Sequence, residues 1–216
     1  MKATPLHWAL GGLAALLGLG LMSGSRGSRG GGLSSSAGAS VASVASQAAR
    51  LWQGLVESMP QALPLLKDYW AAAGLPFPGV GEPWSGAFVS WVVRQSSTPN
   101  AITPSGAHVY YARQAYLDRG RPGRYGAFRP EEVQVEPGDI LIRSRAGAGA
   151  KFSDLQQSGG GFIPMHGDIV TSVGPMDMKV VGGNVDDSVK ERMMAHAGGV
   201  VSDPGVIAVL KLQRSV

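Results

Sequence analysis

The sequence changes its hydrophobic period once along the chain, from about 3.6 residues to about 2. Apolar stripes at helical spacing fill the earlier part, and alternating runs separated by turn residues fill the later part. The expected helices cover 40–59, 62–74, 85–95 and 106–120, and the expected strands cover 136–145, 166–174, 178–185 and 205–213. Helices followed by an antiparallel sheet predict an α+β domain.

An apolar segment precedes these elements. Residues 5–22 are apolar except for His7, and their length is that of a helix crossing about 30 Å of hydrocarbon. A retained membrane anchor is the interpretation that we favour. A cleaved signal peptide is the second, although the residues that follow offer a poor small-x-small site. A buried helix of a soluble domain is the third, and the absence of a polar face argues against it.

The domain organisation follows from these patterns. Residues 23–39 are rich in Gly and Ser, which is typical of a flexible linker. We therefore expect a transmembrane anchor or signal segment at 1–22, then this linker, then an amphipathic helix at 40–59 that lies on the domain or on a membrane. Residues 60–216 are expected to form the domain itself, which is an ordinary length for one domain.

Composition excludes several classes of site. The chain of 216 residues has a formal net charge of +4, which favours anionic surfaces without choosing among them. Basic runs interleaved with aromatics are absent from the sequence, so nucleic acid is not an expected partner. The absence of cysteine excludes disulfides, thiolate metal sites and a cysteine nucleophile. The four histidines are scattered, so neither a metal nor another cofactor is predicted.

The stretch EPWSGAFVSW, residues 82–91, places a hydroxyl at the start of an expected helix. The N–H groups at a helix start lack partners and carry partial positive charge, so they stabilise an anion there. Ser85 is therefore a candidate nucleophile. The alternative is that Ser85 only caps the helix, because serine is a preferred N-cap residue worth about 1 kcal/mol.

Two further residues complete a candidate catalytic set. His166 begins an expected strand, where a general base would be held rigidly, and Asn184 ends the next strand. If the two strands pair as a hairpin, the amide of Asn184 can orient the imidazole of His166. The alternatives are an exposed histidine at a strand end and an ordinary turn asparagine after two glycines.

Three other polar residues are candidates for secondary roles. His108 begins or lines the helix expected at 106–120, in a structural or substrate-contacting position. Asp139 and Asp168 each follow a glycine, in PGD and HGD, where turn and strand-entry roles are sufficient.

The order of these parts resembles a known group of hydrolases. Five blocks are similar to domain-of-unknown-function family 2272, which we take as a branch of the papain-like NlpC and CHAP cell-wall hydrolases. They are Trp84–Trp91, His108–Tyr111, Pro137–Asp139, His166–Val170 and Gly182–Arg192. The resemblance covers about residues 60–213. It implies a papain-like domain in which N-terminal helices pack on a small antiparallel sheet.

The resemblance also implies a function. The expected protein is a membrane-tethered amidase or endopeptidase of peptidoglycan, in which Ser85 attacks, His166 is the general base and Asn184 orients it. Trp84, His108 and Asp168 are expected to contact substrate, and the Gly-rich loop 145–161 is expected to flank the cleft. Serine stands where those hydrolases carry cysteine, and a hydroxyl cannot be ionised in advance as a thiol can. The alternative is therefore a catalytically impaired wall-binding or structural module.

The expected location follows from the apolar segment. An anchor at residues 5–22 would hold the domain at a membrane, facing the periplasm or the cell exterior. A secreted enzyme and a phage lysis or virion component are the alternatives, because a short Gly- and Ala-rich apolar segment joined to a wall-degrading domain is compatible with both.

Overall fold

The helices precede most of the sheet in the chain, as the sequence predicts. The computed structural model describes residues 36–145, 147–157 and 159–214. Its α-helices are α1 (Ser36–Leu51), α2 (Ala62–Ala72), α3 (Ser85–Gln95) and α4 (His108–Leu117). Two short 3-10 helices lie between strands, at Pro130–Glu132 and Phe152–Leu155.

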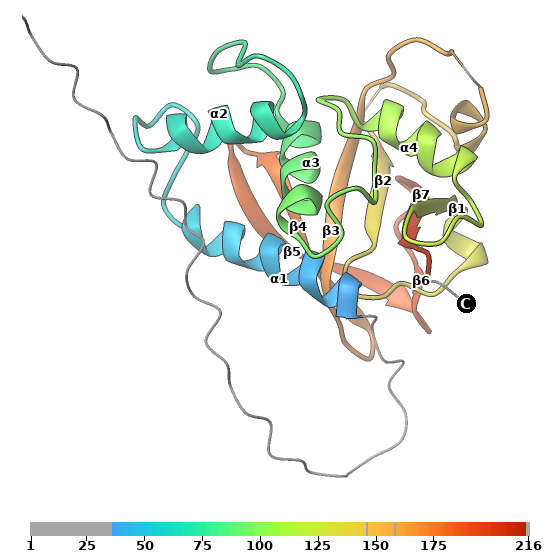
Figure 1. The fold of residues 1–216 in the computed structure, drawn as a ribbon. Helices are drawn as coiled ribbons and strands as arrows, with labels where there is room; N and C mark the ends of the chain where they lie inside the picture. Colours follow the sequence, from blue (N-terminus) through green and yellow to red (C-terminus); the bar gives the residue numbers. More distant parts are fainter. Residues whose placement is uncertain (1–35, 146, 158, 215–216) are drawn as a thin grey trace, which may run out of the picture. The chain divides into compact units, whose positions relative to one another are not determined.

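The strands form a single antiparallel sheet, which curls (Figure 1). They are β1 (Tyr125–Phe128), β2 (Ile140–Ser144), β3 (Met165–Val173), β4 (Asp177–Val185), β5 (Ser188–Ala197), β6 (Val200–Val201) and β7 (Val206–Leu212). Their order in the sheet is β1-β7-β2-β3-β4-β5-β6. β3 therefore lies at the centre, between β2 and β4.

Both faces of the central strands are covered. Ile140 and Ile169 pack with the helices in the larger core, whereas Leu141 and Val170 belong to a second core on the other face. Neighbouring residues alternate between the two faces because the side-chain period of a strand is 2. The curl of the sheet encloses the second core, so β2 reads as a continuous apolar run rather than an alternating one.

α1 packs directly on the sheet. Val41, Ala45 and Ala48 are buried on the face that contacts β3 and α3. The backbone of the helix approaches closely at Gly38, because a Cβ atom on Gly138 would lie 2.4 Å from the Gly38 carbonyl oxygen. Small residues on both sides therefore set the depth at which α1 docks.

An aromatic cluster fixes the start of α3. The rings of Trp52 and Trp84 are stacked with centroids 5.1 Å apart, and Tyr69 lies against both. The indole N–H of Trp52 donates to the Tyr69 hydroxyl (2.7 Å), and that of Trp84 donates to Glu57 (2.6 Å). Both indoles of the stacked pair therefore have a hydrogen-bond partner, and residue 84 is held rigidly.

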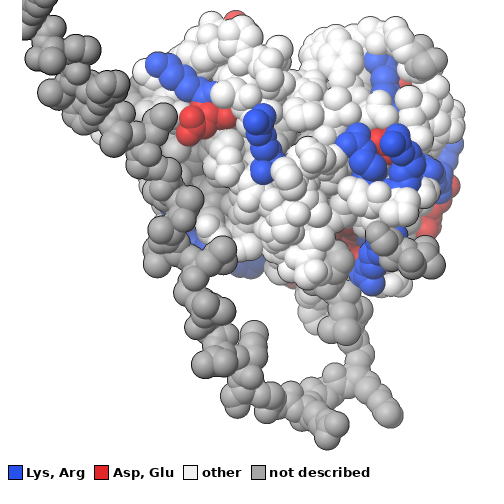
Figure 2. Space-filling model, viewed as in Figure 1, with Lys and Arg blue, Asp and Glu red and all other residues white. Residues whose placement is uncertain are grey.

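The end of α4 is fixed by charge. Arg121 and Arg124 pair with the buried carboxylate of Asp118 at 2.5 and 2.8 Å. Basic side chains also lie beside acidic ones on the right of the face that Figure 2 shows, and other basic side chains stand apart elsewhere on it. Burial alone would raise the pKa of Asp118, but hydrogen bonds from Arg124, Gln114 and Arg121 lower it below its usual value. Asp118 follows the last residue of α4, so these bonds anchor the helix that begins at His108.

Asp139 has the turn role that the sequence allows. Its buried carboxylate accepts hydrogen bonds from the Glu136 backbone N–H and from Lys211, both at 2.8 Å. Burial raises the pKa of Asp139 to about 6, although Lys211 opposes the shift.

This pKa predicts a stability change with pH. Between about pH 4 and pH 6 the folded protein keeps a proton that the unfolded chain has released, so stability should fall as the pH rises. The expected fall is on the order of 3 kcal/mol and should level off above pH 6. Urea unfolding of the wild type and of Asp139→Asn across this range measures it, and the difference between the two isolates Asp139. Parallel pH profiles would contradict the prediction.

The α+β class is confirmed, but the more specific fold prediction was wrong. We expected a papain-like domain, with helices on a small antiparallel sheet, preceded by a transmembrane or signal helix. The sheet instead has seven strands and curls, and α1 is packed on it. Within the described part of the chain, no helix combines the length and hydropathy needed to cross a bilayer. The segment 5–22 lies outside the described residues.

Three strands were missed, and β5 shows why. Its sequence SVKERMMAHA carries the consecutive charged residues Lys190, Glu191 and Arg192, which are exposed or half-buried, while Val189 and Met194 are buried. Charged residues within a strand weaken the sequence signal for it. β1 and β6 are short, with four and two residues. α1 also ends earlier than expected, at Leu51 rather than at residue 59.

Candidate active site

Ser85 is the first residue of α3 and does not cap it. The N-cap is Trp84, whose side chain makes no capping hydrogen bond. The hydroxyl of Ser85 is buried and hydrogen-bonds to a histidine: its Oγ lies 2.7 Å from Nε2 of His108. The residue thus stands beside the unpaired N–H groups of the first helical turn, with its side chain committed to an imidazole.

A glycine lets the two helices approach. A Cβ atom on Gly86 would lie 2.4 Å from the carbonyl oxygen of Gly106. Backbone at that distance cannot yield as a flexible side chain would, so only glycine at residue 86 allows the segment before α4 to lie against α3. His108 follows Gly106 by two residues and begins α4. The close approach at Gly106 therefore places His108 beside Ser85.

His108 is held on both ring nitrogens. Its Nδ1 hydrogen-bonds to the hydroxyl of Tyr111, one helical turn further along α4. Burial is the main cause that lowers the pKa of His108 well below its usual value, and the charges of His166 and Arg145 lower it further. The charge of Asp168 acts in the opposite direction. The imidazole is therefore neutral at physiological pH.

A second histidine lies next to the first. The ring centroids of His108 and His166 are 5.7 Å apart. Nε2 of His166 lies 3.2 Å from Oδ1 of Asp168, and Arg192 donates to the same oxygen at 2.6 Å. Burial would raise the pKa of Asp168, but the hydrogen bonds and charges of His166 and Arg192 lower it below its usual value. Asp168 is therefore a buried carboxylate between two partners.

Glycines on β3 and β4 make room for both histidines. A Cβ atom on Gly167 would lie 2.6 Å from Nδ1 of His108. A Cβ atom on Gly182 would lie 2.4 Å from the Asp168 carboxylate and 2.9 Å from Nε2 of His166. A larger residue at either position would displace a polar side chain of the cluster.

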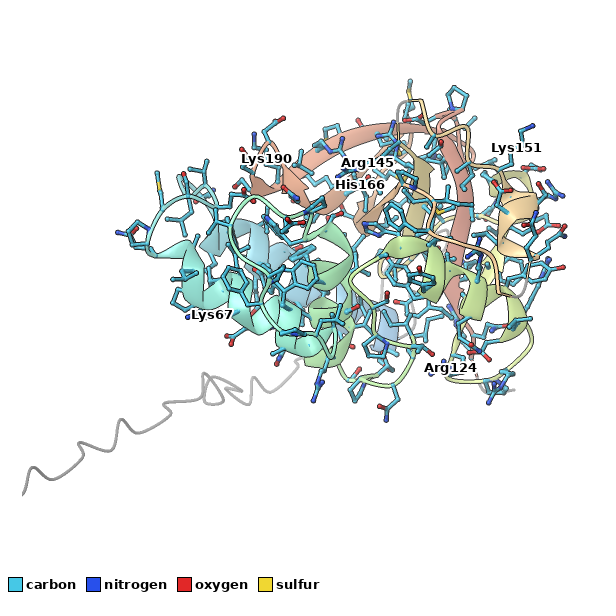
Figure 3. The ribbon with its side chains drawn as sticks, turned by 90° about the horizontal axis from the view of Figure 1, so that it is seen from above. Lys67, Arg124, Arg145, Lys151, His166 and Lys190 are labelled. Atoms are coloured by element: carbon cyan, nitrogen blue, oxygen red, sulfur yellow. The ribbon has the colours of Figure 1, made fainter. Side chains whose placement is uncertain are left out.

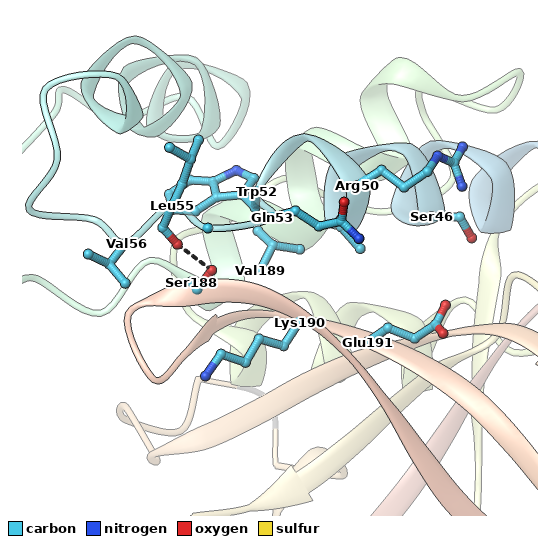
Figure 4. Close-up of a pocket in the computed structure, with 12 residues that line it drawn as sticks. Ser46, Arg50, Trp52, Gln53, Leu55, Val56, Ser188, Val189, Lys190 and Glu191 are labelled. Carbon is cyan, nitrogen blue, oxygen red and sulfur yellow. Dashed lines mark hydrogen bonds between the residues drawn. The ribbon is translucent and has the colours of Figure 1, made fainter.

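A cavity of about 220 Å³ opens onto Ser85 and His108. Its other walls are mostly apolar and include Phe162 and Met165, with Arg145 as a charged member. A larger hollow of about 570 Å³ lies elsewhere, between the end of α1 and β5 (Figure 4). There the hydroxyl of Ser188 donates to the Leu55 carbonyl at 2.8 Å, so that serine is not paired with a base.

Residues 25–212 match the family model described as "Uncharacterized protein conserved in bacteria (DUF2272)". The chain belongs to this family. Comparison with curated proteins and with solved structures finds no match. The DUF2272 resemblance expected from the five sequence blocks is therefore confirmed, whereas nothing found connects the chain to the NlpC and CHAP hydrolases.

The DUF2272 domain brings some of the predicted residues together. Ser85 is hydrogen-bonded to His108, which the sequence had suggested only for a structural or substrate-contacting role. His166 is hydrogen-bonded to Asp168, and among the described residues no hydrogen bond joins it to Ser85. The proposed roles of these residues stay predictions.

Two predicted residues lie apart from this arrangement. Asn184 occupies a left-handed backbone position on β4 (φ 56°), where the register with β5 shifts. Asparagine tolerates this conformation better than most residues. In the described residues no hydrogen bond joins Asn184 to His166. Trp84 is 1% exposed and belongs to the aromatic cluster, so it does not line the cavity.

Three residues of the DUF2272 site were missed from sequence. Tyr111 lies three residues after His108, which puts both on one helix face and could have revealed the pair. Arg192 closes the Gly182–Arg192 block but contacts Asp168 only through the pairing of β3, β4 and β5. Arg145 had no sequence signal beyond its place at the start of the Gly-rich loop.

Proposed function

We propose that this chain is a hydrolase of amide or ester bonds in which Ser85 is the nucleophile and His108 is the general base. The observation that carries the proposal is the 2.7 Å hydrogen bond between Ser85 Oγ and His108 Nε2 at a cavity. A serine needs such a base because its hydroxyl must lose a proton during attack. A neutral imidazole is the form that can accept this proton.

The proposed reaction assigns a role to each group. His108 uses the tautomer with its proton on Nδ1, which donates to Tyr111, so that Nε2 accepts the hydroxyl proton of Ser85. Oγ then bonds to the substrate carbonyl carbon, and the carbonyl oxygen becomes an anion near the first N–H groups of α3. The bond to the leaving group breaks, and His108 returns the proton to that group. Water then releases the acyl group from Ser85 by the same steps.

Peptides of the bacterial cell wall are the proposed substrate class. Two observations support it: the family is conserved in bacteria, and the cavity adjoins a second hollow of about 430 Å³ that shares Gly106 and Ala107. Trp70, Leu75 and Tyr110 line that hollow, so an extended substrate has room beyond the reacting bond. Action on the cell wall would place the protein outside the cytoplasmic membrane. The finer relationship to NlpC and CHAP hydrolases is part of this proposal and is supported by the order of the blocks.

The proposal is tested on the full-length chain with a fluorophosphonate probe and with purified peptidoglycan. We expect the probe to label wild type and the digestion to release new amino groups, with both signals lost in Ser85→Ala. Ser90→Ala is the matched control, because Ser90 is a buried serine of the same helix that bonds to the Ser105 backbone instead of a histidine. Equal labelling of wild type and Ser85→Ala would overturn the proposal.

A wall-binding module without catalysis is the second candidate. The observation that favours it is burial: Ser85 is 3% exposed and His108 is 4% exposed, so a substrate carbonyl must enter a nearly closed site. Sedimentation with peptidoglycan measures binding separately from cleavage. Binding by wild type without labelling, together with activity gained in Ser85→Cys, would establish this second function in place of the first.

A further inference from the structure

We propose that Arg145 selects substrates that carry a carboxylate close to the bond that is cleaved. This inference rests on the proposed function, because it concerns the same cavity. Arg145 lines the cavity together with Ser85 and His108, and Figure 3 shows it in the same region of the molecule as His166.

The charges around the site identify Arg145 as the group that is free to bind an anion. Other arginines near the site already have partners. Arg143 pairs with Asp203 at 2.9 Å and Arg192 with Asp168 at 2.6 Å. The guanidinium of Arg113 donates to the backbone carbonyls of Asp154, Gly160 and Gly161. Among the described residues, Arg145 has no carboxylate partner. A guanidinium presents a planar fork of donors that matches a carboxylate, which makes an unpaired one at a cavity a natural recognition group.

The rest of the cavity strengthens this selection. Pro83, Phe162, Pro164 and Met165 supply apolar walls, so an entering carboxylate meets one guanidinium and little other polar surface. His108 does not compete with Arg145 for the anion, because its imidazole is neutral. Arg145 is then the positive charge among the residues that line the cavity.

The position of Arg145 is set by the sheet and not by the loop alone. Its backbone N–H donates to the carbonyl of Pro164 at 3.3 Å, directly beyond the pair formed by Ser144 and Met165. This bond extends the β2–β3 pairing by one step. The sheet therefore holds the backbone of Arg145 in place beside the cavity that this residue lines.

Two matched esters test the inference: mono-4-nitrophenyl glutarate and 4-nitrophenyl valerate. Both have a five-carbon acyl chain and the same leaving group, and only the first has a free carboxylate. In each case Ser85 would take the acyl group, 4-nitrophenolate would leave, and water would release the acid. We expect wild type to prefer the glutarate ester about tenfold or more in kcat/KM, and Arg145→Gln to bring the ratio of the two kcat/KM values close to one.

The controls separate charge from shape and selectivity from catalysis. Arg145→Lys should keep part of the preference, and Arg94→Gln, which removes an exposed arginine outside the cavity, should keep all of it. An unchanged preference in Arg145→Gln would overturn the inference and leave the proposed function standing. If neither ester is cleaved and the fluorophosphonate probe does not react, the proposed function fails. Calorimetric titration of glutarate then decides about Arg145: binding lost in Arg145→Gln supports the anion site, and no binding to wild type overturns it.

Discussion

His108→Ala should lower kcat/KM for 4-nitrophenyl valerate about a thousandfold or more, whereas His166→Ala should lower it about tenfold or less. The difference follows from the hydrogen bonds. Nε2 of His108 contacts the Ser85 hydroxyl at 2.7 Å, but Nε2 of His166 contacts the carboxylate of Asp168 at 3.2 Å. The loss of His108 removes the proton acceptor, and the loss of His166 removes only a neighbour of that acceptor.

His196→Ala is the matched control for this comparison. His196 is a buried histidine on β5, and it bonds to the backbone of Gly174 and Gly199, away from the cavity. The His196→Ala variant should retain activity close to that of wild type. Circular dichroism checks that the variant is folded. The reverse ranking, with His166→Ala far more damaging than His108→Ala, would return the role of general base to His166.

The pH profile gives an independent readout of the same assignment. Since burial lowers the pKa of His108 well below its usual value, Nε2 stays free to accept a proton in mildly acid solution. The acid limb of kcat/KM should therefore lie below about pH 6.5, the ordinary pKa of a histidine side chain. An acid limb above that midpoint would contradict the assignment.

Gly138→Ala should be strongly destabilising although it lies outside the site, with an expected loss of about 4 kcal/mol or more in the free energy of unfolding. Two effects combine. The backbone of Gly138 has φ +95°, where residues with a Cβ atom are strained, and that Cβ would lie 2.4 Å from the Gly38 carbonyl oxygen. Because the obstacle is backbone of α1, the helix must move as a whole.

Gly120→Ala separates the two effects. Gly120 has nearly the same φ, +91°, but a Cβ atom there meets nothing within 4 Å. It should cost about 1–2 kcal/mol, which is the backbone strain alone. Urea unfolding measures both variants, and hydrogen exchange should show that the amides of α1 lose protection only in Gly138→Ala. Equal costs for the two variants would show that α1 does not depend on this contact.

The sequence predicted the central elements of this fold closely because their patterns are regular. The expected helix 85–95 agrees with α3, and the expected strand 166–174 differs from β3 by one residue at each end. Prediction failed where tertiary contacts override local pattern. β5 tolerates Lys190, Glu191 and Arg192 because these side chains are exposed or half-buried and each has an ion-pair partner.

The candidate site was predicted in part. Ser85 could be found because a hydroxyl at a helix start is a local signal. Its partner could not, because the approach of α3 and α4 depends on a close contact between Gly86 and Gly106, and no local pattern in the sequence shows that these two glycines meet. We expected strand pairing to assemble the site, and the Ser85–His108 bond instead joins two helices.

The stacked indoles of Trp52 and Trp84 give this protein a built-in spectroscopic reporter. With ring centroids 5.1 Å apart and planes inclined by 26°, their electronic transitions are close enough to couple and to produce a distinct near-ultraviolet circular dichroism band. Trp84 is the residue before the candidate nucleophile Ser85 in the chain. Any ligand that shifts the beginning of α3 should therefore alter this band. Occupancy of the site can thus be followed optically, without an attached dye.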